Sequence, residues 1–164
     1  MQIDLFDFSV SGGEAGGAIS LTDLPRVETP DRRGTLVWRA QGSIDRSGHR
    51  IVALEIDGSI ALICQRCLEP LMHQLAIRSR FRLAADEQAA AASDDENDDV
   101  DVIAGSEHFD FDTLIEDEVI LSLPIAPRHI VCPNNADEVL RASGRPSPFA
   151  ALGAFKTRSN ESGK

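Results

Sequence analysis

Apolar and polar residues alternate through residues 34–84 with the period of two that is typical of half-buried β-strands. The alternation predicts four strands, over residues 36–45, 50–56, 60–64 and 74–83. Asp57 and Gly58 predict a tight hairpin between the second and third strands, because both residues tolerate positive φ angles. Four strands joined by short turns favour an antiparallel sheet, either open or curled towards a barrel. Its inner face is predicted to carry Leu36, Trp38, Ala40, Ile44, Val52, Leu54, Ile56, Leu75, Ile77, Phe81 and Leu83.

A helical pattern follows over residues 109–123. We expect Asp110 or Asp112 to cap the N-terminus of this helix and Pro124 to end it. The prolines of residues 124–133 predict an extended segment after it. The side chains expected to face the sheet are Leu114, Ile115, Val119 and Leu121.

The remaining segments lack a clear period. Glycines loosen residues 1–33, where Phe6 and Phe8 predict one short strand packed against the body. Residues 85–108 begin Ala-rich and acidic, with too few apolar side chains to order themselves, and predict a mobile, disordered linker. A short helix is predicted to begin at Ser147 and Pro148, in the basic tail.

The chain is therefore predicted to form an α+β domain, in which one main helix packs against the antiparallel sheet. An acidic disordered linker joins the two, and a short C-terminal helix follows. The predicted parts are an N-terminal strand with a flexible segment, the sheet, the linker, the helix with its Pro-rich extension, and the basic tail. They correspond to residues 1–33, 34–84, 85–108, 109–140 and 141–164.

The net charge of −11 at first argues against a nucleic-acid-binding protein, because phosphate contacts need Lys and Arg. Residues 86–101, however, hold eight acidic residues and no basic one. Without them, 19 acidic residues stand against 16 basic ones, and 14 of these basic residues are Arg, whose guanidinium suits bidentate phosphate contacts. The composition of the body therefore permits RNA binding.

The same composition bears on the compartment. No apolar run approaches the roughly 18 residues of a membrane-spanning helix. Residues 1–8 lack the basic start and apolar stretch of a secretory signal. Three cysteines, an odd number, favour reduced thiols over a disulfide framework. We expect a cytoplasmic protein with no membrane partner.

The most specific motif is the pair Cys64 and Cys67, spaced as Cys-x-x-Cys on a predicted turn. Such a pair forms half of a tetrahedral zinc site, and His129 and Cys132 would supply the other half. The alternative is a pair of structural thiols beside an unrelated Cys132, with no cofactor. A redox role is disfavoured, because the pair does not begin a helix, where a thiolate is stabilised.

Arg78, Arg80 and Arg82 alternate along the outer face of the last predicted strand. Together with Arg66, they are candidates for contact with RNA. The alternative is a solvated sheet face that the acidic segment neutralises.

Carboxylates gather on the predicted helix, where Glu118 lies between apolar positions and is expected to pair with a buried or interface Arg. A solvated helix face with favourable N-terminal charges is the alternative to a functional cluster. For the aromatic side chains of the tail, the alternative is intramolecular packing. The candidates for protein docking are Glu116, Asp117, Glu118, Phe149, Leu152 and Phe155.

Nothing in the sequence requires an enzyme. It contains no Gly-rich phosphate loop, no nucleophile elbow and no Ser/His/Asp arrangement recognisable from spacing. We therefore expect no small-molecule substrate.

Three sequence blocks lie between residues 34 and 155. They are Cys64-Gln65-Arg66-Cys67-Leu68-Glu69-Pro70, then residues 116–124 followed by Pro127, His129 and Cys132, and finally residues 148–152. Together, these blocks resemble the YceD family of large ribosomal RNA subunit accumulation proteins. The resemblance implies a bacterial cytoplasmic protein that affects the synthesis, processing or stability of 23S ribosomal RNA and has no known enzymatic activity. Some members carry further C-terminal cysteines. This chain has none after Cys132, which weakens the zinc interpretation.

We therefore expect a non-catalytic ribosome biogenesis factor that binds 23S rRNA or a large-subunit precursor. One alternative is an acidic adaptor for a basic large-subunit ribosomal protein, without RNA contact. Another is a zinc-dependent hydrolase built on Cys64, Cys67, His129 and the carboxylates.

Overall fold

A computed structural model describes residues 2–93 and 100–133 of the 164-residue chain. Its main feature is an open five-stranded sheet with the strand order β2-β3-β4-β5-β6, which is antiparallel except for the parallel pair β5 and β6. These strands are β2 (Glu14–Ser20), β3 (Thr35–Ile44), β4 (Arg50–Ile63), β5 (Pro70–Ala84) and β6 (Asp101–Ala104). The α+β prediction with a mainly antiparallel sheet is confirmed, and the sheet does not close into a barrel.

Short elements complete the described part of the chain. A second, two-stranded sheet pairs β1 with β7. None of the described helices is long and apolar enough to cross a membrane. The short elements are β1 (Gln2–Ile3), α1 (Leu5–Val10), a 3-10 turn (Leu21–Asp23), α2 (Glu87–Ser93), β7 (Phe109–Asp110) and α3 (Phe111–Ser122).

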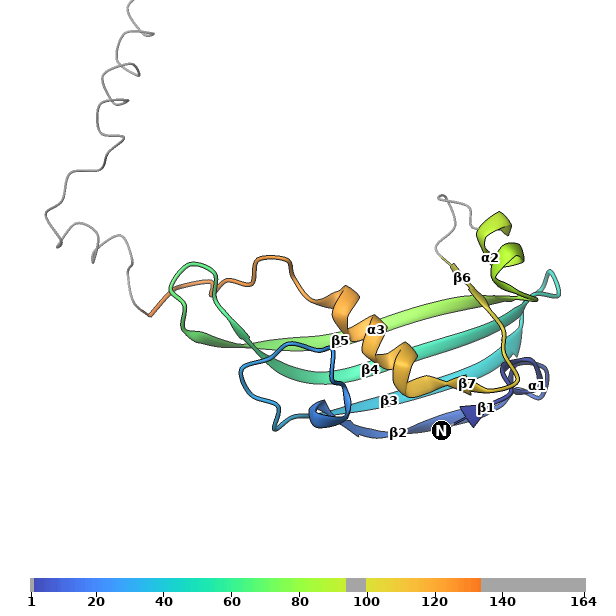
Figure 1. Cartoon of the computed structure of the whole chain (residues 1–164), viewed down its shortest axis with the longest axis horizontal. Helices are drawn as coiled ribbons and strands as arrows, with labels where there is room; N and C mark the ends of the chain where they lie inside the picture. Colours follow the sequence, from blue (N-terminus) through green and yellow to red (C-terminus); the bar gives the residue numbers. More distant parts are fainter. Residues whose placement is uncertain (1, 94–99, 134–164) are drawn as a thin grey trace, which may run out of the picture.

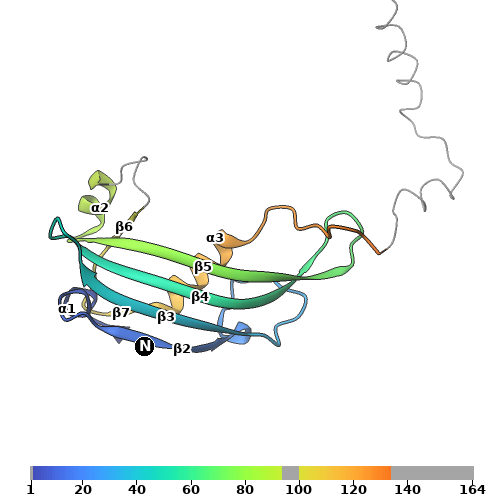
Figure 2. The same cartoon turned by 180° about the vertical axis from the view of Figure 1, so that it is seen from behind.

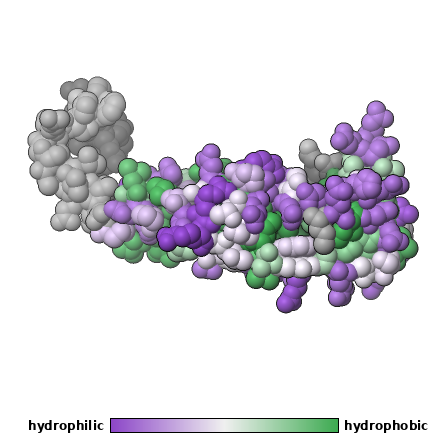
Figure 3. Space-filling model, turned by 60° about the horizontal axis from the view of Figure 1, so that its bottom comes forward, coloured by the Kyte–Doolittle hydropathy of each residue, from purple (hydrophilic) through white to green (hydrophobic). Residues whose placement is uncertain are grey.

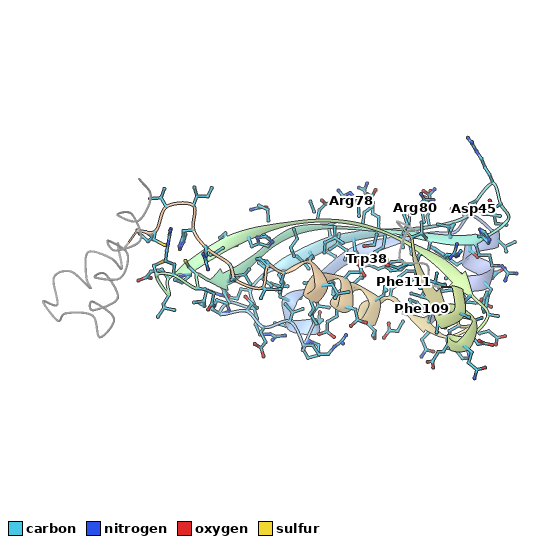
Figure 4. The ribbon with its side chains drawn as sticks, turned by 90° about the horizontal axis from the view of Figure 1, so that it is seen from above. Trp38, Asp45, Arg78, Arg80, Phe109 and Phe111 are labelled. Atoms are coloured by element: carbon cyan, nitrogen blue, oxygen red, sulfur yellow. The ribbon has the colours of Figure 1, made fainter. Side chains whose placement is uncertain are left out.

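Helix α3 lies across one face of the sheet, which bends around it (Figures 1 and 4). Asp110 caps its N-terminus by accepting a hydrogen bond from the Asp112 amide, as predicted. Phe111, which the pattern missed, is fully buried against the sheet. Leu121 was expected to face the sheet but is 78% exposed, because it lies on the solvent side of the last turn. The inward residues of α3 are Phe111, Leu114, Ile115, Glu116 and Val119.

Among the described residues, no helix lies on the opposite face of the sheet (Figure 2). The segment before β3 instead helps α3 to cover the inner face, through the fully buried side chains of Leu24 and Val27. Within the described part of the chain, the sheet therefore has an inner face covered by α3 and an outer face without a covering helix. Ile44 was predicted to face inward, but at the end of β3 it lies beyond the core and is exposed.

The predicted hairpin at Asp57 and Gly58 is wrong, because residues 50–63 form one continuous strand. Asp57 pairs with Val37 on one side and Ala76 on the other, so the ladder runs through this position. Neither residue has the positive φ that the turn would need. Gly58 serves close packing instead: a methyl group there would lie 2.5 Å from Leu36 Cδ2.

The Gly-rich N-terminal segment is also more regular than predicted. Phe6 and Phe8 lie on α1 rather than on a strand, and residues 14–20 form the edge strand β2. Gly16 permits this pairing, because a methyl group there would lie only 2.9 Å from the Trp38 carbonyl oxygen.

The described residues of the predicted acidic linker contain α2 and β6, so the prediction of a disordered segment over residues 85–108 is wrong for this part. Val102 and Ile103 extend the sheet by pairing in parallel with Arg82 and Leu83. Backbone pairing orders a stretch whose composition alone favours disorder. The predicted helix in residues 141–164 lies outside the described residues.

Candidate functional site

The most concentrated set of chemically reactive side chains lies at one end of the sheet, where β4 leads into β5. We call residues 64–69, which connect these strands, the cysteine loop. The loop folds back on itself: the Cys64 amide donates to the Glu69 carbonyl oxygen at 3.0 Å, and the Leu68 amide donates to the Cys64 carbonyl oxygen at 2.9 Å. Leu68 has a φ of 61° and is the only described non-glycine residue with a positive φ. The loop thereby directs Cys64 and Cys67 to the same side.

The 124–133 segment, which follows α3, supplies the other half of the cluster. It runs alongside the cysteine loop at the end of the sheet (Figures 1 and 2). The Gln65 amide donates to the Pro127 carbonyl oxygen at 2.8 Å and fixes the two segments to each other. His129 and Cys132 then lie against Cys64 and Cys67.

The four donor atoms form a compact group. The ligand atoms of Cys64, Cys67, His129 and Cys132 all lie within 4.8 Å of one another. Cys64 Sγ is 3.7 Å from Cys132 Sγ, and Cys67 Sγ is 3.3 Å from His129 Nδ1. All three cysteines are free thiols. The structure thus brings together all four residues that the sequence selected as candidate metal ligands.

Hydrogen-bond donors surround the sulfur atoms. Burial raises the pKa of Cys64, but hydrogen bonds from the backbone amides of Cys67, His129 and Arg66 outweigh it and lower the pKa to about 5. Burial raises the pKa of Cys67, and its thiol neighbours act in the same direction. The cluster therefore favours negative charge on at least one sulfur.

Arg66, selected from the sequence for contact with RNA, is part of this cluster. Its Nε donates to Cys132 Sγ at 2.9 Å, and its Nη2 donates to the His129 carbonyl oxygen at 3.1 Å. Sequence reasoning missed this role, because Arg66 and Cys132 are 66 positions apart and only the fold brings them together.

The arginines predicted to alternate on one strand do so on β5, and Arg78 and Arg80 project from the outer face of the sheet (Figure 4). Their surroundings differ. Arg78 Nη2 lies 2.9 Å from both carboxylate oxygens of Asp57, which neutralises its charge. Arg80 lies opposite Ala53, so no acidic residue of β4 faces it directly, whereas Arg82 is partly buried and lies opposite the buried Ile51.

The three α3 carboxylates proposed for protein docking make contacts within the described structure. Glu116 accepts hydrogen bonds from the backbone amide and the Nε of Arg26, and Asp117 lies 2.7 Å from Arg26 Nη1. Glu118 accepts a hydrogen bond from Ser79 Oγ, so the carboxylates that pair with an Arg are Glu116 and Asp117 rather than Glu118. These contacts fasten α3 to the sheet and to the segment before β3. The docking candidates Phe149, Leu152 and Phe155 lie outside the described residues.

Glu116→Gln is expected to lower the free energy of unfolding at neutral pH by about 1–3 kcal/mol, because it removes charge-assisted hydrogen bonds to Arg26. Burial raises the pKa of Glu116, but the hydrogen bonds from Arg26 outweigh it, so the pKa lies below its ordinary value. The stability that this carboxylate contributes is therefore present above the ordinary glutamate pKa and is lost as the pH falls through the lowered one. Urea unfolding of the wild type and of Glu116→Gln at decreasing pH should show the difference between their free energies of unfolding becoming smaller.

Asp117→Asn is the matched control, since Asp117 binds the same guanidinium but its side chain is 47% exposed. Its expected cost is below about 1 kcal/mol. Equal costs for the two variants, or a Glu116→Gln difference that does not change with pH, would contradict the assignment of a special role to Glu116.

Apolar side chains are exposed around the cysteine loop, at the left end of the molecule in Figures 1 and 3. Leu68 is the exposed member in the loop, while Ile125, Ile130 and Val131 are exposed along the 124–133 segment. Exposed apolar side chains therefore lie on both segments that carry the sulfur cluster.

Comparison with known protein families identifies the chain's relatives. The model of the family described as "Large ribosomal RNA subunit accumulation protein YceD" matches residues 52–156, which is more than half of the chain. The chain belongs to the YceD family. The match includes both halves of the Cys/His cluster, whereas β1 to β3 precede it. The resemblance seen in the sequence is thus confirmed. No solved structure matches the chain significantly.

The family description refers to accumulation of the large ribosomal RNA and thereby supports a part in ribosome biogenesis. It names no enzymatic activity.

Proposed function

We propose that this YceD family member supports accumulation of 23S ribosomal RNA by binding the rRNA or a large-subunit precursor in the cytoplasm, without catalysing a reaction. The observation that carries this proposal is the outer face of the sheet. Among the described residues no helix covers it, and Arg80 is exposed on it with the uncharged Ala53 opposite on β4 (Figure 4). Guanidinium groups on a regular strand can follow a phosphate backbone without reading its sequence.

Two rows of residues that pair across the strands differ in charge on this face. In the first, the exposed Arg39 of β3 and Arg78 of β5 lie on either side of Glu55 of β4, so positive and negative charges alternate. In the second, Arg80 is followed by the uncharged Ala53 and Gln41, and the one acidic residue is Glu14 on the edge strand β2. We therefore propose that the RNA contact lies around Arg80 on the outer face.

The arrangement of the carboxylates supports binding rather than hydrolysis. Glu116 and Glu118 are occupied by Arg26 and Ser79, and α3 lies over the middle of the sheet, whereas the sulfur cluster lies at its end (Figure 1). A metal-dependent hydrolase needs a carboxylate or histidine poised beside a metal-bound water. The carboxylates of α3 are not placed for that role.

The proposal is tested with Arg80→Glu, which is expected to weaken binding of the purified protein to 23S rRNA across different RNA sequences. The dependence of log affinity on log salt concentration should become shallower by about one unit. In cells depleted of the native protein, the variant should restore less of the large rRNA than the wild type and should sediment in lighter fractions of a gradient.

Arg33→Glu is the matched control, because it makes the same charge change on an exposed loop residue paired with Asp31. It should bind and complement as the wild type does. If both variants behave like the wild type in every assay, the outer face is not the RNA contact.

The net charge of −11 favours a second candidate, an acidic adaptor for a basic large-subunit ribosomal protein. Salt-sensitive binding to such a protein, together with normal behaviour of Arg80→Glu and no binding to 23S rRNA, would select the adaptor.

A further inference from the structure

We propose that Cys64, Cys67, His129 and Cys132 bind one zinc ion in a closed tetrahedral site that holds the 124–133 segment against the cysteine loop. The site goes beyond the role in rRNA accumulation and stands independently of it. It rests on the distances between the donor atoms, the orientation of the histidine and the charges around the sulfurs.

The distances suit a single ion. Zinc–sulfur bonds of about 2.3 Å in a regular tetrahedron place two sulfur ligands about 3.8 Å apart. Cys64 Sγ and Cys132 Sγ are 3.7 Å apart, and all four donor atoms lie within 4.8 Å of one another. Two of the donors come from each of two segments that are more than 60 positions apart in the sequence. A chance meeting of unrelated thiols would not also place an imidazole nitrogen in the same group.

The imidazole of His129 is held in the form that binds a metal. Its Nε2 is 3.1 Å from the Pro70 carbonyl oxygen, which can only accept a hydrogen bond, so Nε2 carries the proton. In the neutral ring, Nδ1 is then unprotonated, and it lies 3.3 Å from Cys67 Sγ, facing the sulfur cluster. A metal-binding histidine commonly donates its other N–H to a carbonyl or carboxylate in this way, which fixes its tautomer and orientation.

The charges around the site also balance. One divalent ion, three thiolates and a neutral imidazole carry a net charge of −1, and the guanidinium of Arg66 supplies the opposite charge through its 2.9 Å contact with Cys132 Sγ. The His129 amide donates to Cys64 Sγ at 3.4 Å. Such N–H groups stabilise a metal-bound thiolate without competing for its metal.

The donor set selects both the metal and its role. Three thiolates and one imidazole in tetrahedral geometry suit zinc, whose structural sites use this Cys3His combination. Four protein ligands leave no position for a reactive water, so the site is structural rather than catalytic. The bound ion would fix a segment without regular secondary structure, in which Ile130 and Val131 are exposed, onto the end of the sheet.

The first test uses the full-length protein, purified under reducing conditions from cells supplied with zinc. Elemental analysis should find one zinc per chain, and X-ray absorption at the zinc edge should show three sulfur neighbours and one nitrogen neighbour. Replacement by Co²⁺ should give intense thiolate charge-transfer bands and the visible bands of tetrahedral cobalt. Less than a tenth of an equivalent of zinc with no such bands, bound iron in place of zinc, or a different donor set would overturn the proposal.

The second test assigns the ligands. Cys132→Ser and His129→Gln should each lower zinc affinity by at least a hundredfold in competition with a chromophoric chelator, whereas the nearby His73→Gln should not change it. Arg66→Ala, which keeps all four ligands, should lower the affinity by about 10–100-fold. If the ligand variants do not fold, addition of chelator to the wild type should still increase hydrogen exchange at residues 64–69 and 127–133 when zinc is removed. Unchanged exchange or unchanged affinity would contradict the site.

Discussion

Phe111→Ala is expected to lower the free energy of unfolding by about 3–5 kcal/mol, because it removes a large aromatic side chain from a site that cannot collapse around the cavity. Phe111 is fully buried in the first turn of α3. Its ring stacks on Trp38 with 5.4 Å between the ring centroids, and meets the rings of Phe8 and Phe109 edge to face at 5.7 and 5.6 Å. Figure 4 shows the rings of Trp38, Phe109 and Phe111 together between the sheet and the helix. One substitution therefore weakens contacts of α1, β3, β7 and α3 at once.

Urea unfolding followed by circular dichroism would measure this loss, with the fluorescence of Trp38, the one tryptophan of the chain, as a local probe. Leu121→Ala on the exposed side of α3 is the control, and it should change the stability by less than about 0.5 kcal/mol. A loss below about 1 kcal/mol for Phe111→Ala would show that the aromatic cluster does not hold α3 to the sheet.

Gly42→Ala is expected to cost about 3 kcal/mol or more, because the added methyl group meets backbone atoms that cannot move aside. It would overlap the Phe8 carbonyl oxygen and lie 2.7 Å from the carbonyl carbon of the same residue. The Gly42 amide also donates to the Gly13 carbonyl oxygen at 2.8 Å, which ties the end of α1 to β3. The substitution would displace α1 and expose Leu5 and Phe8, which are buried in the native protein.

The matched substitution is Gly17→Ala on the adjacent strand, where the nearest atom to the added methyl group is Trp38 Nε1 at an ordinary 3.7 Å. We expect Gly17→Ala to fold as the wild type does. Hydrogen exchange should show faster opening of α1 in Gly42→Ala alone. Equal stability of the two variants would mean that α1 does not pack on Gly42 as the structure has it.

The strands with clear alternation could be predicted from the sequence, because their inner residues face one apolar layer. Trp38 and Ala40 on β3 and Ile77 and Phe81 on β5 are such residues. The strand β2 could not be predicted, since its glycines and small residues show no apolar alternation and Gly16 is required by the close approach of the Trp38 backbone. The continuity of β4 through Asp57 and Gly58 was missed for a related reason: its partner strands on both sides outweigh the local preference for a turn.

For the Cys/His cluster, the types of the four candidate ligands and the spacing of Cys64 and Cys67 were sufficient to select the set. The parts that sequence could not provide are the contacts that orient these ligands. The carbonyl oxygen of Pro70, which fixes the orientation of the His129 ring, is a backbone atom, so the residue type at position 70 does not indicate this contact. The contact of Arg66 with Cys132 depends on the path of the chain after α3. Both follow from tertiary structure alone.

The contacts between the first and last described segments also determine when the protein can fold during its synthesis. Gln2 pairs with Asp110, and Arg26 binds Glu116, 90 positions later in the chain. At ribosomal elongation rates of about 5–20 residues per second, roughly 5–20 s separate the synthesis of Arg26 from that of its partner. During that interval β2 to β4 leave the ribosome with their inner face uncovered, because α3 has not yet been made. The nascent chain is therefore expected to need chaperone protection until α3 emerges, and to fold late and in one cooperative step.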